Sequence, residues 1–166
     1  VRYGVTRNHV VGLEMVLPNG EVVRTGGKIV KISSGYDLTQ VVIGSEGTLA
    51  LVTRIWLKLS RRPANTRTVL APFANLDEVT AAIPHILAAG LDPLILEYID
   101  LLTMAAILNR SGMDLGIPED VKSTALAYLV VQISDDLEDR ADADAVRLGE
   151  LLAGELGAMD VYVLPG

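Results

Sequence analysis

The pattern of apolar and polar positions changes character near residue 60 of the chain. Up to that point, short runs rich in β-branched residues are separated by glycine, proline and asparagine. Beyond it, strand-like apolar runs alternate with longer stretches in which apolar residues recur at helical spacing. The pattern therefore predicts a mainly β segment over residues 1–60, followed by a mixed segment of strands and helices.

The segment 1–60 begins with a clear hairpin signal. Two extended runs within residues 10–25 flank a Pro-Asn-Gly turn at residues 17–21, and such a turn predicts a β-hairpin. The elements expected after it are an extended piece following residue 27, a short helical turn starting at Asp37, an extended run at 41–43, a tight turn at 44–48 and a strand at 49–59.

The segment 61–166 is predicted to be a second domain. The stretch 60–65 is polar and contains a proline, which is typical of a linker. The elements expected beyond it are strands at 66–73, 94–99, 125–133 and 158–164, helices at 76–89, 100–109 and 135–155, and a Gly- and Pro-containing excursion at 111–123. This order is that of a ferredoxin-like split βαβ unit with an extra helix inserted between its second and third strands. The predicted fold class is α+β, with an antiparallel sheet and helices on one of its faces.

Composition limits the chemistry that this chain can carry out. Half of its 166 residues are hydrophobic, which is enough for a buried core, and its net charge of -7 argues against nucleic-acid binding. The absence of cysteine excludes a disulfide, an iron–sulfur cluster or a thiol nucleophile in this chain. No apolar run approaches the ~20 residues of a membrane span, so we expect a cytoplasmic protein without a transmembrane segment. Because the chain opens on Val1 and stops just after a predicted strand, we also expect it to be a piece of a longer protein.

The tight turn Gly44-Ser45-Glu46-Gly47 is the first candidate for a binding function. Its two glycines allow positive φ angles or a close approach of the backbone to a ligand, and the turn exposes successive N–H groups that can meet an anion. Taken alone, the motif favours an ordinary turn.

The neighbouring motifs change this interpretation. In chain order they are Tyr3-Gly4-Val5-Thr6-Arg7-Asn8-His9 with Gly12-Leu13-Glu14, Leu17-Pro18-Asn19-Gly20-Glu21, Gly26-Gly27-Lys28, Gly35-Tyr36-Asp37-Leu38 and Gly44-Ser45-Glu46-Gly47-Thr48-Leu49. Together they resemble the end of the flavin domain in the vanillyl-alcohol oxidase / p-cresol methylhydroxylase (PCMH) superfamily. The most similar branch contains the glycolate oxidase flavin subunit and the FAD-dependent D-lactate and D-2-hydroxyglutarate dehydrogenases. The resemblance is strong over 1–60 and looser over 61–166, where residues 96–100 match the start of a substrate-domain helix.

The resemblance implies a domain assignment and a function. Residues 1–60 would be the C-terminal part of a PCMH-type FAD-binding domain, and 61–166 the N-terminal part of a ferredoxin-like substrate (cap) domain. The parent protein would oxidise a small 2-hydroxyacid by hydride transfer to FAD and pass electrons to an acceptor, such as an iron–sulfur or other electron-transfer partner subunit. In the family, the pyrophosphate loops and the histidine-rich substrate motifs lie outside the region matched here. FAD binding by this chain alone is therefore expected to be weak or absent, and its catalytic residues are unknown.

The cofactor-binding residues implied by the resemblance fall in two groups. The first group lies along the flavin nucleotide through backbone atoms and comprises Gly44, Glu46, Gly47, Thr48, Leu49, Ala50, Leu51 and Val52. The second group borders the cofactor and comprises Tyr3, Gly4 and Thr6. Ala50 stands where the family usually has glycine, so its methyl group is expected to weaken or shift the close approach.

Other polar residues are predicted to be structural. His9 and His85 are too few for a metal site without carboxylate help, and the acidic cluster at residues 135–139 lacks the spacing of a calcium loop. No metal site is therefore expected. An alternative function remains open at this point, in which residues 61–166 form a free-standing ferredoxin-like module that binds a ligand or a partner. The block 1–60 distinguishes the two hypotheses, because such a module does not need the Gly-Ser-Glu-Gly-Thr-Leu motif.

Overall fold

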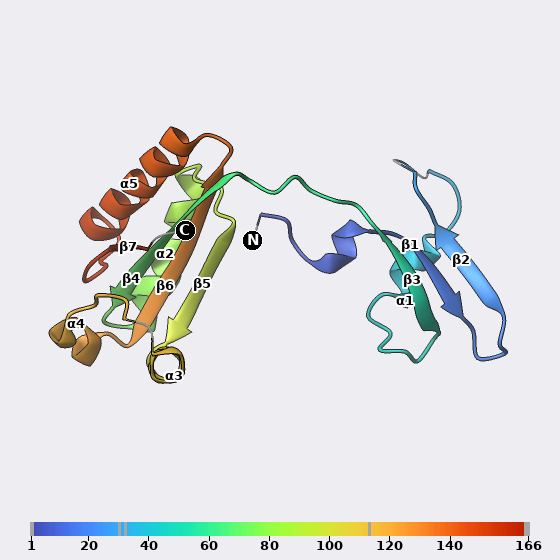
Figure 1. The fold of residues 1–166 in the computed structure, drawn as a ribbon, viewed down its shortest axis with the longest axis horizontal. Coiled ribbons are helices and arrows are strands. Elements are labelled where there is room, and N and C mark those ends of the chain that lie inside the picture. The colour runs from blue at the N-terminus through green and yellow to red at the C-terminus, as the bar shows by residue number, and fades with distance from the viewer. Residues whose placement is uncertain (1, 30, 32, 113, 165–166) are drawn as a thin grey trace. The chain divides into compact units, whose positions relative to one another are not determined.

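A computed structural model describes residues 2–29, 31, 33–112 and 114–164 (Figure 1). The chain divides into two compact units between Arg61 and Arg62. The N-terminal unit is Tyr3–Arg61, and the C-terminal unit is Arg62–Gly166 together with Val1–Arg2. Both units combine helices with an antiparallel sheet, which confirms the α+β class.

The N-terminal unit is built on a three-stranded antiparallel sheet with the order β2-β1-β3. Its strands are β1 (Val10–Val16), β2 (Val22–Gly26) and β3 (Leu51–Leu57), and a short 3-10 turn, η1 (Thr6–His9), precedes them. The predicted hairpin is confirmed, since β1 pairs with β2 across a turn closed by the Gly20 N–H, which donates to the Leu17 carbonyl at 2.9 Å.

Gly26 ends β2 with a backbone geometry that requires glycine. Its φ is +62°, and a Cβ at this position would overlap the carbonyl oxygen of Val11. The same carbonyl accepts a hydrogen bond from the Gly27 N–H at 2.9 Å. The close approach of the two strands here therefore depends on the missing side chain.

The segment between β2 and β3 differs from the prediction. The extended run expected at 41–43 is wrong, because α1 (Leu38–Val42) covers most of it, and no described residue of the expected piece after residue 27 forms a strand. Val30 and Ile32 of that piece lie outside the described residues. The helical turn predicted at Asp37 is confirmed, since the Asp37 side chain accepts from the Gln40 N–H at 3.2 Å. This cap, and the packing of Val42 on the core of β1, outweigh the β preference of valine.

The C-terminal unit contains a four-stranded antiparallel sheet with the order β5-β6-β4-β7. Its strands are β4 (Asn65–Phe73), β5 (Ile95–Asp100), β6 (Ala127–Asp135) and β7 (Tyr162–Leu164). This order confirms the ferredoxin-like arrangement. Strand β7 is shorter than expected: the Ala158 N–H donates to the Leu152 carbonyl of α5, and the Met159 N–H makes a single bond to the Pro72 carbonyl of β4 ahead of the regular ladder.

Two helices, α2 (Leu76–Ala88) and α5 (Glu138–Gly154), cover one face of this sheet. The main core lies between them and alternate residues of the central strands. Its fully buried members are Val69, Ala71, Phe73, Val79, Ile86, Leu129, Val131, Leu148 and Leu152. The helix predicted to open at Asn75 is confirmed, since the Asn75 side chain accepts from the Glu78 N–H at 2.9 Å.

The expectation of helices on one face only is wrong. The insertion between β5 and β6 forms α3 (Leu101–Ser111) and α4 (Glu119–Thr124), of which only α3 was expected. It packs on the opposite face, where Met104 and Ile117 join Leu70 and Tyr128 in a second core cluster. The strand residues that alternate with those of the main core point to the other face of the sheet, and they are also apolar. Both faces of the sheet must therefore be covered by helices.

Candidate functional site

The turn after α1 contains three residues with positive φ angles. Gly44, Glu46 and Gly47 have φ angles of +90°, +52° and +79°. The Thr48 N–H and hydroxyl both donate to the Ser45 carbonyl, at 2.9 and 2.6 Å, and hold the turn in this shape. The prediction of a backbone conformation that is costly for other residues is thus confirmed at both glycines.

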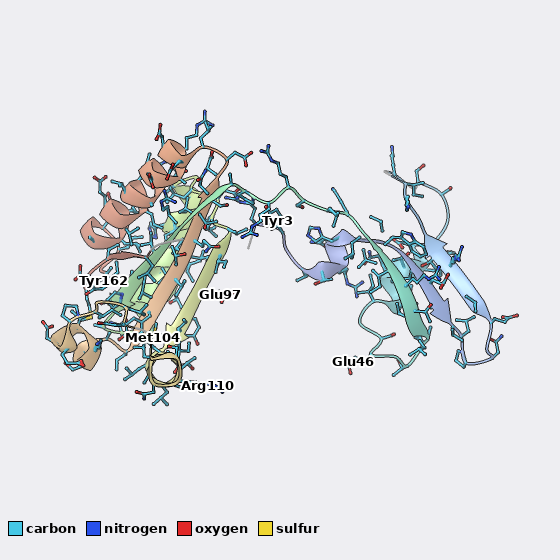
Figure 2. The ribbon with its side chains drawn as sticks, in the orientation of Figure 1. Tyr3, Glu46, Glu97, Met104, Arg110 and Tyr162 are labelled. Atoms are coloured by element: carbon cyan, nitrogen blue, oxygen red, sulfur yellow. The ribbon has the colours of Figure 1, made fainter. Side chains whose placement is uncertain are left out.

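This turn is open to solvent. Gly44 and residues 46–49 are all exposed, and Figure 2 shows the labelled Glu46 side chain at its tip. An added Cβ on Gly47 would meet no heavy atom within 4 Å. The N–H groups of the turn that are not used internally are therefore accessible to a bound group.

Ala50 differs from its neighbours in this segment. Its side chain is only 5% exposed and packs with Leu13 and Met15 in the core of the N-terminal unit, whereas Leu51 is 69% exposed. The methyl group that replaces the usual glycine consequently faces the core. The expectation that it weakens or shifts a close approach of a ligand stays a prediction.

The second group of predicted residues lies in the segment that leads into β1. Gly4 has a φ of +70°, and a Cβ there would lie 2.7 Å from the Asn8 Nδ2. The His9 Nε2 lies 3.0 Å from the Tyr3 carbonyl oxygen, and the two rings meet edge to face at 6.3 Å. Thr6 begins η1. His9 therefore contacts the loop that carries Tyr3 and Gly4, while the choice between a structural role and a role at the edge of the cofactor stays a prediction.

Arg7 joins these two groups, and sequence reasoning did not single it out. Its Nη1 donates to the Gln40 carbonyl at 2.8 Å and to the Gln40 Oε1 at 3.1 Å, and its Nη2 donates to the Ile43 carbonyl. A Cβ on Gly44 would lie 3.2 Å from that Nη2. The side chain thus connects η1 to the start of the Gly44 turn, and its place directly after Thr6 was the available signal.

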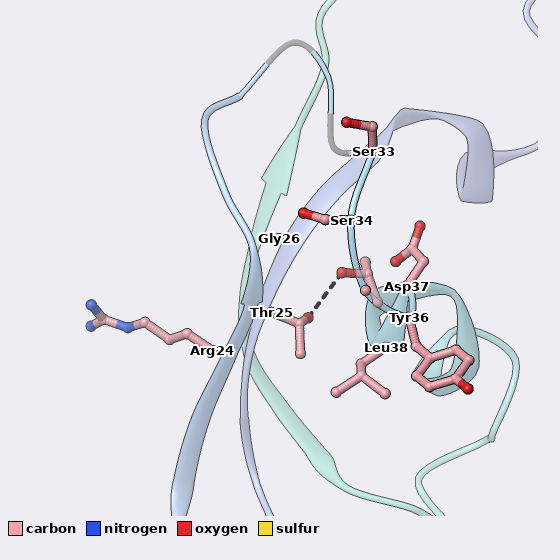
Figure 3. Close-up of a pocket in the computed structure, with 10 residues that line it drawn as sticks. Arg24, Thr25, Gly26, Ser33, Ser34, Tyr36, Asp37 and Leu38 are labelled. Carbon is pink, nitrogen blue, oxygen red and sulfur yellow. Dashed lines mark hydrogen bonds between the residues drawn. The ribbon is translucent and has the colours of Figure 1, made fainter.

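A polar pocket of about 370 Å³ lies at the opposite end of α1 (Figure 3). The loop Ser33–Leu38 and the end of β2 line it, and inside it the Thr39 hydroxyl donates to the Thr25 hydroxyl at 2.9 Å. A second pocket of about 410 Å³ lies beside β3, between Trp56 and the lysines Lys28 and Lys58. Neither pocket includes a residue of the predicted cofactor segment, and neither was predicted.

The most strongly held charge of the N-terminal unit is the Glu14 carboxylate on the central strand. It is 8% exposed, and its Oε2 accepts from the Arg24 Nε and Nη2 at 2.8 and 2.7 Å. Thr53 and Arg54 approach its Oε1 at 3.2 and 3.4 Å. The hydrogen bond from Arg24, followed by those from Thr53 and the charge of Arg54, lowers the pKa of Glu14 against the opposing effect of burial. This group is a structural ion pair that ties the three strands together.

No group of three or more histidine, cysteine or acidic side chains is arranged for a metal ion within the described parts of the chain. His85 instead places its Nδ1 2.8 Å from the Ala81 carbonyl on its own helix. Asp135 accepts from the Leu137 N–H at 2.8 Å, at the entry to α5, and Glu138 pairs with Arg67 at 3.0 Å. The acidic cluster therefore serves the start of a helix.

Comparison with known proteins identifies the family. Residues 62–164 match the family described as FAD linked oxidases, C-terminal domain. Over all 166 residues the chain is 53% identical to an uncharacterized FAD-linked oxidoreductase of Mycobacterium tuberculosis, of which it covers 36%. It is 42% identical over 126 residues to the glycolate oxidase subunit GlcD of Bacillus subtilis, which is 76% of this chain and 26% of that protein. The chain belongs to the FAD-linked oxidase family.

A further relative agrees with this assignment, and two solved structures share the fold. A D-lactate dehydrogenase of Anaerostipes hadrus is 32% identical over 164 residues, which cover 98% of the chain and 34% of that protein. The fold is shared with alkyldihydroxyacetonephosphate synthase, with a TM-score of 0.67 over 99% of this chain and 31% of that one at 16% identity. It is also shared with p-cresol methylhydroxylase, with a TM-score of 0.63 over 93% of this chain and 34% of that one. The chain thus matches these relatives over nearly all of its own length but spans only about a third of theirs.

Proposed function

We propose that the protein to which this chain contributes is a FAD-dependent oxidoreductase that oxidises a small 2-hydroxyacid of the glycolate or D-lactate type. The observation that carries this proposal is that the match to the relatives runs through both units. The relatives named for glycolate, D-lactate and D-2-hydroxyglutarate support the substrate class. The alternative of a free-standing ferredoxin-like module is disfavoured, because it does not explain why residues 1–60 also match the relatives.

The described residues fit one edge of a flavin nucleotide. The Gly44–Gly47 turn presents backbone atoms to solvent, no heavy atom lies within 4 Å of the place that a Cβ on Gly47 would take, and Arg7 places a cation beside the turn. We propose that Gly44 and Glu46 to Val52 contact FAD, largely through the backbone, and that Tyr3, Gly4 and Thr6 border it. These residues would hold and orient FAD, which when bound would supply the hydride acceptor for the substrate. The general base, by this proposal, lies outside the chain.

The proposal includes an electron acceptor. By this proposal, electrons would leave the site to a quinone, to oxygen or to an electron-transfer partner such as an iron–sulfur subunit, and the name of the GlcD relative as a subunit favours a partner. We place the protein in the cytoplasm. Within the described residues, no helix combines the length and apolar character needed to cross a membrane.

The reaction is tested with the full-length protein that contains these residues. Its visible spectrum should show bound flavin, and anaerobic addition of glycolate, D-lactate or D-2-hydroxyglutarate should bleach that flavin, with L-lactate as the stereochemical control. The 166-residue chain alone should lose added FAD on desalting. Full-length protein without flavin, or flavin that none of the hydroxyacids reduces, would refute the proposed function.

The cofactor segment is tested by Gly47→Val in the full-length protein, with Gly20→Val as the matched control. Both glycines have positive φ, at +79° and +87°, and neither has a heavy atom within 4 Å of an added Cβ. The backbone strain is therefore similar, on the order of 1–3 kcal/mol. Gly47→Val should reduce the flavin content of the purified protein, whereas Gly20→Val should leave it unchanged. Equal flavin content in the two variants would remove Gly47 from the site.

A further inference from the structure

We propose that Arg7 is a positioning residue that fastens the Gly44–Gly47 turn to the Tyr3–Thr6 segment. The part of this proposal that concerns FAD rests on the proposed function. The part that concerns the turn rests on contacts within the N-terminal unit alone.

The first argument is the hydrogen-bond inventory at the end of α1. The last four carbonyls of a helix lack intrahelical partners, and in the five-residue helix α1 these are most of its carbonyls. The Gln40 and Ile43 carbonyls both accept from the Arg7 guanidinium. A cation at this end of a helix is also favoured by the helix dipole. Arg7 therefore fixes the direction in which the chain leaves α1 and enters the turn.

The second argument is the fit between Arg7 and Gly44. The guanidinium lies so close to Gly44 that a Cβ there would be 3.2 Å from its Nη2. Gly44 thus satisfies two demands, a φ of +90° and room for the Arg7 side chain. The Gln40 side chain adds a further link, since its Oε1 accepts from Arg7 at 3.1 Å.

The third argument is the electrostatic difference between Arg7, which lies in η1, and two arginines of the sheet. Arg24 and Arg54 pair with the Glu14 carboxylate, at 2.7 and 3.4 Å. Among the contacts described for Arg7, all acceptors are carbonyl or amide oxygens. Its charge is therefore not cancelled by a carboxylate in these contacts. A cation in this position can hold the turn and also favour the approach of an anionic cofactor.

The chemistry requires arginine in particular. The planar guanidinium donates to Gln40 and Ile43 at the same time, through two different nitrogens. A lysine ammonium is a single point charge and cannot reproduce this fork. Arg7→Lys should therefore keep the charge but lose part of the hold on the turn.

The local part is tested by hydrogen–deuterium exchange on the 166-residue chain. In Arg7→Ala, exchange of the hydrogen-bonded amides of this segment, those of Ile43, Ser45 and Thr48, should rise about tenfold, which corresponds to the loss of a charge-assisted hydrogen bond. Arg7→Lys should give a smaller rise, and the β1–β2 hairpin should stay protected in both. Arg54→Ala, which removes an arginine of the sheet, should leave residues 43–49 as in the wild type. Unchanged exchange in Arg7→Ala and Arg7→Lys would overturn the proposal. If Arg7→Ala does not fold, Arg7→Lys decides alone.

The cofactor part is tested by flavin release from the full-length protein. Arg7→Ala should release FAD about tenfold faster than wild type and Arg54→Ala, and the visible spectrum of flavin retained by Arg7→Lys should be shifted. A purely structural role would instead lower the unfolding midpoint without changing that spectrum. Raised exchange together with unchanged flavin release and spectrum would overturn the cofactor part. If the wild-type protein holds no flavin, the proposed function fails, whereas the exchange result still decides whether Arg7 holds the turn.

Discussion

The two units bury their apolar residues to very different degrees. Of the 23 buried hydrophobic residues in the described parts of the chain, the N-terminal unit contributes three, Leu13, Met15 and Ala50. The same unit contributes 13 of the 24 exposed large hydrophobic residues, although it is much the shorter of the two. The C-terminal unit therefore has a core of its own, whereas the N-terminal unit presents an apolar surface to solvent.

Strand β3 shows where this difference arises. It is an edge strand, and six of its seven residues are exposed. Edge strands and large apolar patches are typical of surfaces that bind further protein or a ligand. Since the relatives are about three times as long as this chain, we expect the N-terminal unit to be completed by other parts of the parent protein.

Charge separates the units as well. The N-terminal unit has seven basic and four acidic residues, a net charge of +3, whereas the rest of the chain has seven basic and 17 acidic residues, a net charge of -10. The overall charge of -7 therefore conceals two opposite surfaces. An anionic nucleotide cofactor is attracted to the N-terminal unit, which is where the proposed site lies.

The largest expected effect comes from the core of the C-terminal unit. Phe73→Ala should destabilise that unit by about 3–5 kcal/mol, because Phe73 is fully buried between the sheet and its helices. Leu13→Ala should cost about 2 kcal/mol in the N-terminal unit, where a small cluster can collapse around the gap. Trp56 is the only tryptophan, so its fluorescence reports the N-terminal unit, and far-ultraviolet dichroism reports the helix-rich C-terminal unit.

In urea titrations, Phe73→Ala should shift the dichroism transition and leave the fluorescence transition in place, and Leu13→Ala should do the reverse. If each variant moves both transitions equally, the two units unfold as one and the comparison fails.

A smaller effect is expected from acid in the N-terminal unit. The pKa of Glu14 is lowered from its ordinary value of 4.5, mainly by the hydrogen bond from Arg24. A carboxyl with a lowered pKa stabilises the folded state above its unfolded pKa, and this contribution is lost as the pH falls through its folded pKa. The midpoint of the Trp56 fluorescence transition should therefore fall as the pH drops below 4.5.

Glu14→Gln and Arg24→Ala should both lower this midpoint at neutral pH and weaken its dependence on acid. A Glu14→Gln variant with the same acid dependence as wild type would show that another group is responsible.

Local signals account for the parts of the fold that the sequence predicts well. Asn75 and Asp100 each accept from the N–H three residues later, at 2.9 Å, so the starts of α2 and α3 follow from one polar residue before an apolar run. Residues 41–43 were misjudged because two valines and an isoleucine favour a strand when taken alone. Their helix depends on packing against Leu13 and Met15, which lie far away in sequence.

The same distinction applies to the site. The positive φ angles of Gly44 and Gly47 follow from glycine at those positions, whereas the φ of +52° at Glu46 does not follow from its residue type. The burial of Ala50 and the reach of Arg7 to Gln40 depend on how β1, β3 and α1 come together, which no local pattern encodes. Their roles become apparent only from the tertiary structure.

The pairing of β4 with β6 has a consequence for the way the protein is made. In this ladder Phe73 lies opposite Ala127 and Asn65 lies opposite Asp135, with α2, β5, α3 and α4 all falling between the partners in the chain. During translation, the apolar strand β4 leaves the ribosome long before its partner exists. Such distant pairing slows folding and leaves an unpaired strand edge exposed in the meantime. The C-terminal unit, although it has the larger buried core once formed, is therefore the one that most needs protection from aggregation while it is being synthesised.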